Sequence, residues 1–191
     1  MSDDWAFELQ AKQAITEIIY RYARAIDRMD ELLLRSVFHP GSRHCHFYEG
    51  PSSDPGIPSS EGAPGDFVAF ALGVLSAYSR THHQLGNTLI QLEGKSAANA
   101  ETYFTAYHRT RARGDPLAAP NAYDTEMDYF VGGRYLDRFE YRDQEWKIVQ
   151  RTGMTDWVRL EPASSQGFND IAVQTIGKRA PHDPVCEFYS A

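Results

Sequence analysis

An aspartate and a histidine, Asp27 and His83, have the residue types and positions that suit proton-transfer chemistry. Asp27 continues an apolar stripe, because Ile19 and Ala23 precede it at intervals of four residues and this spacing puts all three on one helix face. A carboxylate on an inward face is costly unless it is paired, and the dipole near a helix C-terminus disfavours its charge. We therefore expect a cationic or hydrogen-bonding partner for Asp27.

The stretch "THHQLGN" reads as the start of a strand and supplies an imidazole. Strand alternation puts His83, Leu85, Asn87 and Leu89 on one face and His82 on the other. A histidine paired with a carboxylate has a fixed tautomer and raised basicity, which suits proton abstraction at neutral pH. Asn87 would either bind a substrate oxygen or satisfy a buried backbone group.

Aromatic and cationic residues are candidates for the remainder of a binding pocket. Tyr22 lies among the isoleucines of the helix, so its hydroxyl either reaches the pocket wall or stays in the core. Tyr48 is a further candidate for the wall. Tyr103 and Tyr107 share a strand face with an intervening threonine, a mixed surface that suits a pocket. Arg151, on the last strand, would hold an anion or form a structural pair with a carboxylate.

Less specialised interpretations of these residues stay open. Asp27 would also fit a solvent-exposed position beside a neighbouring arginine, and His83 would fit a half-buried site with satisfied hydrogen bonds. His44 and His46 share a strand face, which raises the question of a metal. No carboxylate or cysteine lies at a spacing that would complete a metal site with these histidines, so we predict no metal. We also predict no cofactor.

Composition narrows the classes of protein to consider. The 191 residues favour one domain, and 42% hydrophobic residues are enough to bury one core. A formal net charge of −7 argues against nucleic-acid binding, which needs clustered Lys and Arg. No apolar run of membrane length appears, and we read no secretion signal. Two distant cysteines, Cys45 and Cys186, suggest free thiols in a reducing cytoplasm.

Helical spacing dominates the first part of the chain, and alternation begins near residue 80. Asp30 is a plausible N-cap for a second helix, and Gly132-Gly133 suggests a bulge that bends a strand. We predict helices over residues 5–30, 30–38 and 66–80, an extended segment at 42–50, a loop at 50–66, and strands over 81–94, 96–111, 124–143 and 144–160.

This order predicts an α+β fold in which a curved antiparallel sheet wraps around a long N-terminal helix and forms a conical pocket. We place the domain at residues 1–158. The tail, residues 159–191, has weak periodicity, so we expect it to pack on the domain or on a neighbouring subunit.

Four stretches carry a family resemblance: "YRYARAIDRMD", "THHQLGN", "GKSAANAETYFTAYHR" and "GRYLDRFEYRDQEWKIVQRTGMTDW". Over about residues 8–158 the chain resembles the SnoaL-like branch of the nuclear transport factor two superfamily. Lyases of that branch include scytalone dehydratase, bile-acid 7α-dehydratase and hexachlorocyclohexane dehydrochlorinase. They place an Asp near the end of the first long helix and a His on the strand after the third helix, which Asp27 and His83 match. The bile-acid enzyme adds a Tyr at the position of Tyr22.

The resemblance implies a cofactor-independent, dehydratase-like lyase that acts on a small hydrophobic oxygenated ring compound. The Asp27–His83 pair would be the base, and Tyr22 would donate a hydrogen bond to the substrate. The alternatives are an isomerase or polyketide cyclase, an aldehyde-releasing lyase, and a non-catalytic ligand-binding module such as the small subunit of an oxygenase. The resemblance also implies a homo-oligomer, a trimer or a dimer.

Overall fold

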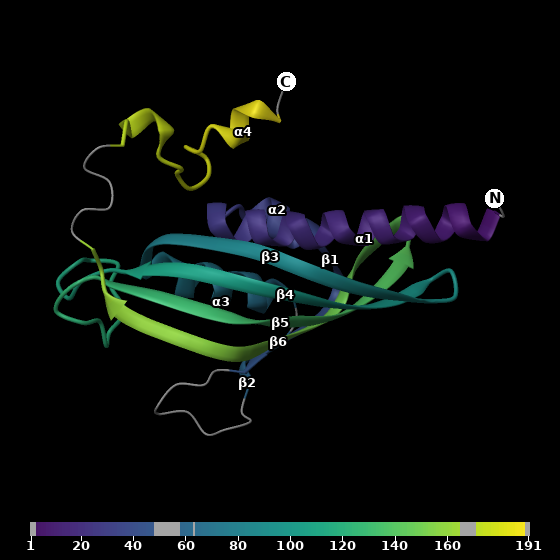
Figure 1. The fold of residues 1–191 in the computed structure, drawn as a ribbon, viewed down its shortest axis with the longest axis horizontal. Coiled ribbons are helices and arrows are strands. Elements are labelled where there is room, and N and C mark those ends of the chain that lie inside the picture. Colours follow the sequence, from purple (N-terminus) through teal and green to yellow (C-terminus); the bar gives the residue numbers. More distant parts are fainter. Residues whose placement is uncertain (1–2, 48–57, 63, 165–170, 190–191) are drawn as a thin grey trace.

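A long helix lies along one side of a strongly curved sheet in the computed structural model (Figure 1), which describes residues 3–47, 58–62, 64–164 and 171–189. The helices are α1 (Asp3–Arg28), α2 (Glu31–Ser36), α3 (Pro64–Ser76) and α4 (Val185–Phe188), with a 3-10 turn at Val173–Thr175. The strands are β1 (Phe38–Phe47), β2 (Pro58–Gly62), β3 (Tyr78–Glu93), β4 (Ala97–Thr110), β5 (Met127–Arg142) and β6 (Glu145–Pro162).

The strands form one sheet in the order β2-β1-β6-β5-β4-β3. Every neighbouring pair is antiparallel except β1 and β6, which are parallel. The predicted α+β class, with a curved sheet against the N-terminal helix, is confirmed. The prediction of a loop throughout residues 50–66 is wrong in part, because β2 pairs with β1 there. The backbone groups of an otherwise exposed edge of β1 gain partners in this way.

The core forms where the apolar stripe of α1 meets one face of the sheet, which we call the inner face. The stripe buries Ile15, Ile19, Tyr22 and Ile26 almost completely. The inner face opposes it with small and apolar side chains: Ala98, Ala100, Tyr135, Phe139 and Ile148. The helix lies closest to β3 and β6, and burial of this apolar surface drives the packing.

The end of α1 is fixed by local hydrogen bonds. Met29 has a positive φ of 52°, which breaks the helical path. Asp30 then caps α2, because its carboxylate accepts a hydrogen bond from the backbone N–H of Leu33 at 3.0 Å. The predicted N-cap is confirmed. Asp27 is therefore held in the last turn of α1, just before the chain reverses.

Two of the register shifts in the sheet help to set which side chains face the core. The strand register shifts between Gly132 and Gly133, as the glycine pair predicts. A Cβ atom on Gly133 would overlap the carbonyl oxygen of Met154, so only glycine fits this close approach. A second shift lies between Leu85 and Thr88 on β3, and the sequence analysis did not predict it.

Strand β6 continues past the predicted boundary at residue 158, to Pro162. Residues 171–189 return to the end of α1, where the backbone N–H of Ala180 donates to the carbonyl oxygen of Arg28 at 2.7 Å. The division into a domain and a tail stays a prediction. Within the described ranges, none of the helices has the length and apolar character needed to cross a membrane.

Candidate active site

Asp27 and His83 meet inside the fold through two hydrogen bonds. The ring Nδ1 of His83 lies 2.8 Å from Oδ1 of Asp27, and the backbone N–H of His83 donates to Oδ2 at 2.7 Å. Both side chains are nearly buried, with exposed fractions of 8% for Asp27 and 9% for His83. The inward aspartate predicted from the stripe therefore has the partner that its burial demands.

The surroundings of Asp27 determine its protonation state. Burial raises the pKa of Asp27, but the hydrogen bond from the His83 ring, the charge of that ring and the His83 backbone N–H together outweigh burial and lower it. Asp27 is thus ionised at neutral pH and can only accept hydrogen bonds. Nδ1 of His83 therefore donates the hydrogen bond between the two side chains, and Nε2 is the ring nitrogen that makes no bond to Asp27.

A second imidazole, His108 on β4, lies beside His83. The two ring centroids are 5.3 Å apart and the planes are nearly perpendicular, at 89°. Burial, followed by the charge of His83, lowers the pKa of His108 to about 3, so His108 is neutral at physiological pH. Its Nδ1 is buried and, within the described part of the chain, has no hydrogen-bond partner.

The sequence analysis missed His108 because it followed the wrong face of β4. Thr102, Ala106 and His108 alternate as buried residues along this strand. Tyr103, Thr105 and Tyr107 face outward, whereas Phe104 shares the inner face. Simple alternation from the small, buried Ala98 and Ala100 would have assigned His108 to the inner face.

Aromatic rings surround the two imidazoles. Phe104 lies 6.4 Å from His83 between ring centroids and stacks on Tyr135 at 4.4 Å. Tyr78, the first residue of β3, lies 4.8 Å from His108. The polar atoms of the site therefore lie in an environment of low polarity, where their electrostatic interactions are stronger than in water.

Tyr22 and Arg151 belong to a neighbouring buried network. Arg151 is fully buried and forms two hydrogen bonds of 2.6 Å to the carboxylate of Asp137. Its guanidinium lies 3.9 Å from the ring centroid of Tyr22 and 4.2 Å from that of Tyr135. The structural pair is thus the interpretation of Arg151 that the geometry supports, and Tyr22 contacts this network rather than the ring of His83.

Two predicted pocket residues lie on the opposite, outer face of the sheet. Tyr103 is 42% exposed and lies beneath the guanidinium of Arg134. Tyr107 donates a hydrogen bond to Asp128 at 2.9 Å. Both tyrosines thus lie on the face of β4 opposite His108, away from the Asp27–His83 pair, and their role in substrate binding stays a prediction.

Asn87 is also exposed, contrary to its predicted place on the face of His83. The bulge between Leu85 and Thr88 reverses the alternation, and Leu89 is consequently 67% exposed. Tyr48 lies outside the described residues. As for metals, the described residues contain no group of three or more His, Cys, Asp or Glu side chains placed to hold an ion.

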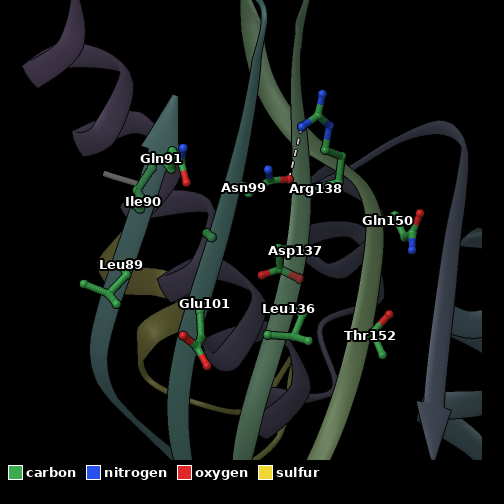
Figure 2. Close-up of a pocket in the computed structure, with 11 residues that line it drawn as sticks. Leu89, Ile90, Gln91, Asn99, Glu101, Leu136, Asp137, Arg138, Gln150 and Thr152 are labelled. Atoms are coloured by element: carbon green, nitrogen blue, oxygen red, sulfur yellow. Dashed lines mark hydrogen bonds between the residues drawn. The ribbon is translucent and has the colours of Figure 1, made fainter. Parts of the chain in front are cut away.

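A groove of about 780 Å³ lies on the outer face of the sheet and does not include Asp27 or His83. Figure 2 shows its side chains, with the helices behind the strands. The outward lining combines charged and amide groups with two exposed leucines, Leu89 and Leu136. The Asp27–His83 pair therefore lies away from this groove.

Comparisons with known proteins agree with this fold. A scytalone dehydratase candidate from Novosphingobium aromaticivorans DSM 12444 has 18% sequence identity and a TM-score of 0.64, over 83% of this chain and 93% of that one. A type 2 hexachlorocyclohexane dehydrochlorinase (LinA) has 18% identity and a TM-score of 0.65, over 88% and 99%. The Kfla4162 protein from Kribbella flavida has 19% identity and a TM-score of 0.62, over 78% and 92%. No curated protein sequence matches.

These structural likenesses establish a shared fold. The sequence profile of the SnoaL-like domain matches residues 8–152, which is most of the chain and spans both α1 and the strand that carries His83. The chain belongs to the SnoaL-like domain family.

Proposed function

We propose that this protein is a cofactor-independent, dehydratase-like lyase in which the Asp27–His83 pair is the base. The observation that supports this proposal is the buried pair itself, joined at 2.8 Å from carboxylate to ring nitrogen. An ionised carboxylate orients the imidazole and stabilises its cationic form once a proton has been taken. A purely structural histidine needs no ionised carboxylate in an apolar environment, where burying that charge is costly.

In the proposed reaction, Nε2 of His83 removes a proton from a carbon next to an activating group of the substrate. The electron pair of that C–H bond forms a carbon–carbon double bond, and the bond to a hydroxyl on the neighbouring carbon breaks. The proton on His83 then passes to the departing oxygen, so water leaves and the imidazole is neutral again. Asp27 stays ionised throughout and balances the transient charge on His83.

His108 assists in this scheme as a neutral hydrogen-bonding group. Its low pKa, about 3, keeps a second positive charge away from the imidazolium of His83. Among the described residues Nδ1 of His108 has no hydrogen-bond partner, and in this scheme it pairs with a polar atom of the substrate. The donor role predicted for Tyr22 stays a prediction, because the contact of Tyr22 with Arg151 places it in the neighbouring network.

The surroundings of the pair support a small, hydrophobic, oxygenated ring compound as the substrate class. Phe104 and Tyr78 flank the two imidazoles with aromatic surface, which suits a flat ring. Two similar structures carry names of elimination enzymes, a dehydratase and a dehydrochlorinase. The same base would also serve the loss of an aldehyde or of halide, so the leaving group must be measured.

The test is a screen of hydroxylated ring compounds with product analysis by mass spectrometry. Loss of 18 mass units, the mass of water, identifies dehydration, whereas a product of unchanged mass identifies the isomerase or cyclase alternative. His83→Ala should lower turnover about 10²–10⁴-fold. His82→Ala is the matched control, because His82 is the exposed neighbour on the opposite strand face. Full turnover by His83→Ala would refute the assignment of the base.

A further inference from the structure

We infer that residues 176–185, which we call the C-terminal clasp, position Asp27 against His83, and that Arg179 is the positioning residue through which the clasp acts. An effect of the clasp on catalysis rests on the proposed function of the pair. Its effect on the position of His83 does not depend on that function. The clasp forms hydrogen bonds to α1, which carries Asp27, and to the start of β3, which carries His83. These two elements are far apart in the sequence. Figure 1 shows the C-terminal segment above the end of α1.

On the side of α1, the clasp contacts the residue directly after Asp27. The backbone N–H of Ala180 donates to the carbonyl oxygen of Arg28 at 2.7 Å, and Nη1 of Arg28 donates to the carbonyl oxygen of Lys178 at 3.1 Å. A Cβ atom on Gly177 would approach Nη1 of Arg28 to 3.2 Å. The last turn of α1 is therefore held by backbone and side-chain bonds at once, where helix carbonyls otherwise lack partners.

On the side of β3, Arg179 bonds to the junction with α3. Its Nη2 donates to the carbonyl oxygens of Leu75 and Tyr78, both at 2.8 Å. Leu75 lies in the last turn of α3, and Tyr78 is the first residue of β3, five positions before His83. One charged group thus fixes the point from which the strand carrying the imidazole departs.

The clasp is itself ordered by a buried carboxylate. Asp183, with an exposed fraction of 7%, accepts hydrogen bonds from the backbone N–H groups of Lys178 at 2.8 Å and Val185 at 3.0 Å. It also lies 3.6 Å from Nη1 of Arg28. Asp183 thereby closes the turn that presents Arg179 and ties it to α1.

Charge adds to this geometry. Burial lowers the pKa of Arg179, the charge of Arg111 lowers it further, and the carboxylate of Asp27 opposes both. The charge of Asp27 therefore favours the cationic form of Arg179. Removal of Arg179 should loosen the position of His83.

The backbone amide of His83 is a direct reporter of this arrangement, because its hydrogen bond is to Asp27. We propose to measure its hydrogen exchange in the full-length protein without ligand. Arg179→Gln should accelerate the exchange of this amide about tenfold, while amides in the centre of β4 and β5 keep their rates. Arg113→Gln is the matched control, because Arg113 also bonds to a backbone carbonyl, that of Ala122, but far from the pair.

Asp27→Asn provides the positive reference, since it removes the acceptor carboxylate itself. Asp183→Asn provides a second clasp variant, so the inference stays testable if Arg179→Gln does not fold, and Arg179→Lys should restore part of the protection. An unchanged His83 exchange rate in a folded clasp variant, with faster exchange in Asp27→Asn, would overturn the inference. Because no substrate is used, this outcome is independent of whether the proposed lyase activity is found.

Discussion

Both oxygens of the Asp27 carboxylate accept hydrogen bonds from one residue, His83, one from its ring and one from its backbone. The first bond sets the rotation of the imidazole and the second sets the position of the strand that carries it. A single carboxylate therefore fixes where Nε2 of His83 points. This double contact distinguishes the pair from an exposed surface ion pair, in which both side chains stay flexible.

Replacement of Asp27 by asparagine should lower catalytic turnover about 10²–10⁴-fold, with a smaller change in KM. The amide is uncharged, so it cannot stabilise a cationic His83, and it presents a donor to one of the two N–H groups. Steady-state kinetics on the substrate found by the screen will measure the effect. Asp156→Asn is the control, since Asp156 forms a partly exposed ion pair with Arg134. Equal turnover by the two variants would argue against a catalytic Asp27.

His108 should make the protein less stable as the pH falls from about 6.5 toward 3. Its folded pKa is about 3, while an unfolded histidine has a value of about 6.5. Within this window the unfolded chain binds the extra proton, so the free energy of unfolding falls by up to about 1.4 kcal/mol per pH unit. His108→Gln should flatten the dependence in urea titrations between pH 7 and 4. An identical slope in the two proteins would contradict the neutral, buried imidazole.

Asp27 affects the stability of the protein in a lower pH range than His108 does, so the two contributions can be separated. Its folded pKa is lowered, so its contribution is present above the unfolded value of about 3.9 and is lost as the pH falls through the folded value. Comparison of His108→Gln with the wild type above pH 4 therefore isolates the histidine.

Disruption of the buried ion pair should be costly. Arg151→Met leaves the carboxylate of Asp137 buried without its cation, and the expected loss of stability is about 3–5 kcal/mol. The control Arg134→Met breaks partly exposed ion pairs with Glu101 and Asp156 and should cost about 0–1 kcal/mol. Chemical denaturation will compare them. The double variant Arg151→Met/Asp137→Leu should regain stability, and failure to do so would mean that the lost packing on Tyr22 dominates.

The bulge between β5 and β6 should tolerate no side chain at Gly133. Alanine there would collide with the Met154 carbonyl oxygen and crowd the ring of Phe104, and overpacking of this kind costs about 1–3 kcal/mol. Gly73→Ala in α3 meets open space and should leave stability unchanged or raise it by about 0.5–1 kcal/mol. Thermal unfolding followed by circular dichroism measures both, and an unaffected midpoint for Gly133→Ala would show that the strands separate without penalty.

Local patterns predicted the fold because each element carries its own signal. The stripe of α1, the N-cap at Asp30 and the glycine bulge at Gly132-Gly133 depend on residues close in sequence. The same holds for Asp27, whose intrusion into an apolar stripe indicates a buried acid before any partner is known. The strand β2 was missed because it forms only against β1, within a segment whose glycines and prolines indicate a loop.

The remaining errors concern which face of a strand is buried. Alternation predicts two faces, but only the packing of α1 decides which is inner, so Tyr103 and Tyr107 were assigned to the pocket in place of His108. The bulge between Leu85 and Thr88 moved Asn87 away from the face of His83, and Gly86 within it is a signal that the sequence analysis did not use. The sequence around Arg179 did not predict a positioning role, because Arg179 bonds to backbone carbonyls of residues that lie far from it in the chain.

The parallel pairing of β1 with β6 has a consequence for biosynthesis. His44 pairs with Arg151, more than one hundred residues further along, so β1 lacks this neighbour until β6 has been synthesised. Contacts between such distant segments also slow folding. The antiparallel hairpin of β3 and β4, which carries His83, joins neighbouring segments and can therefore form during synthesis, before β1 and β6 pair.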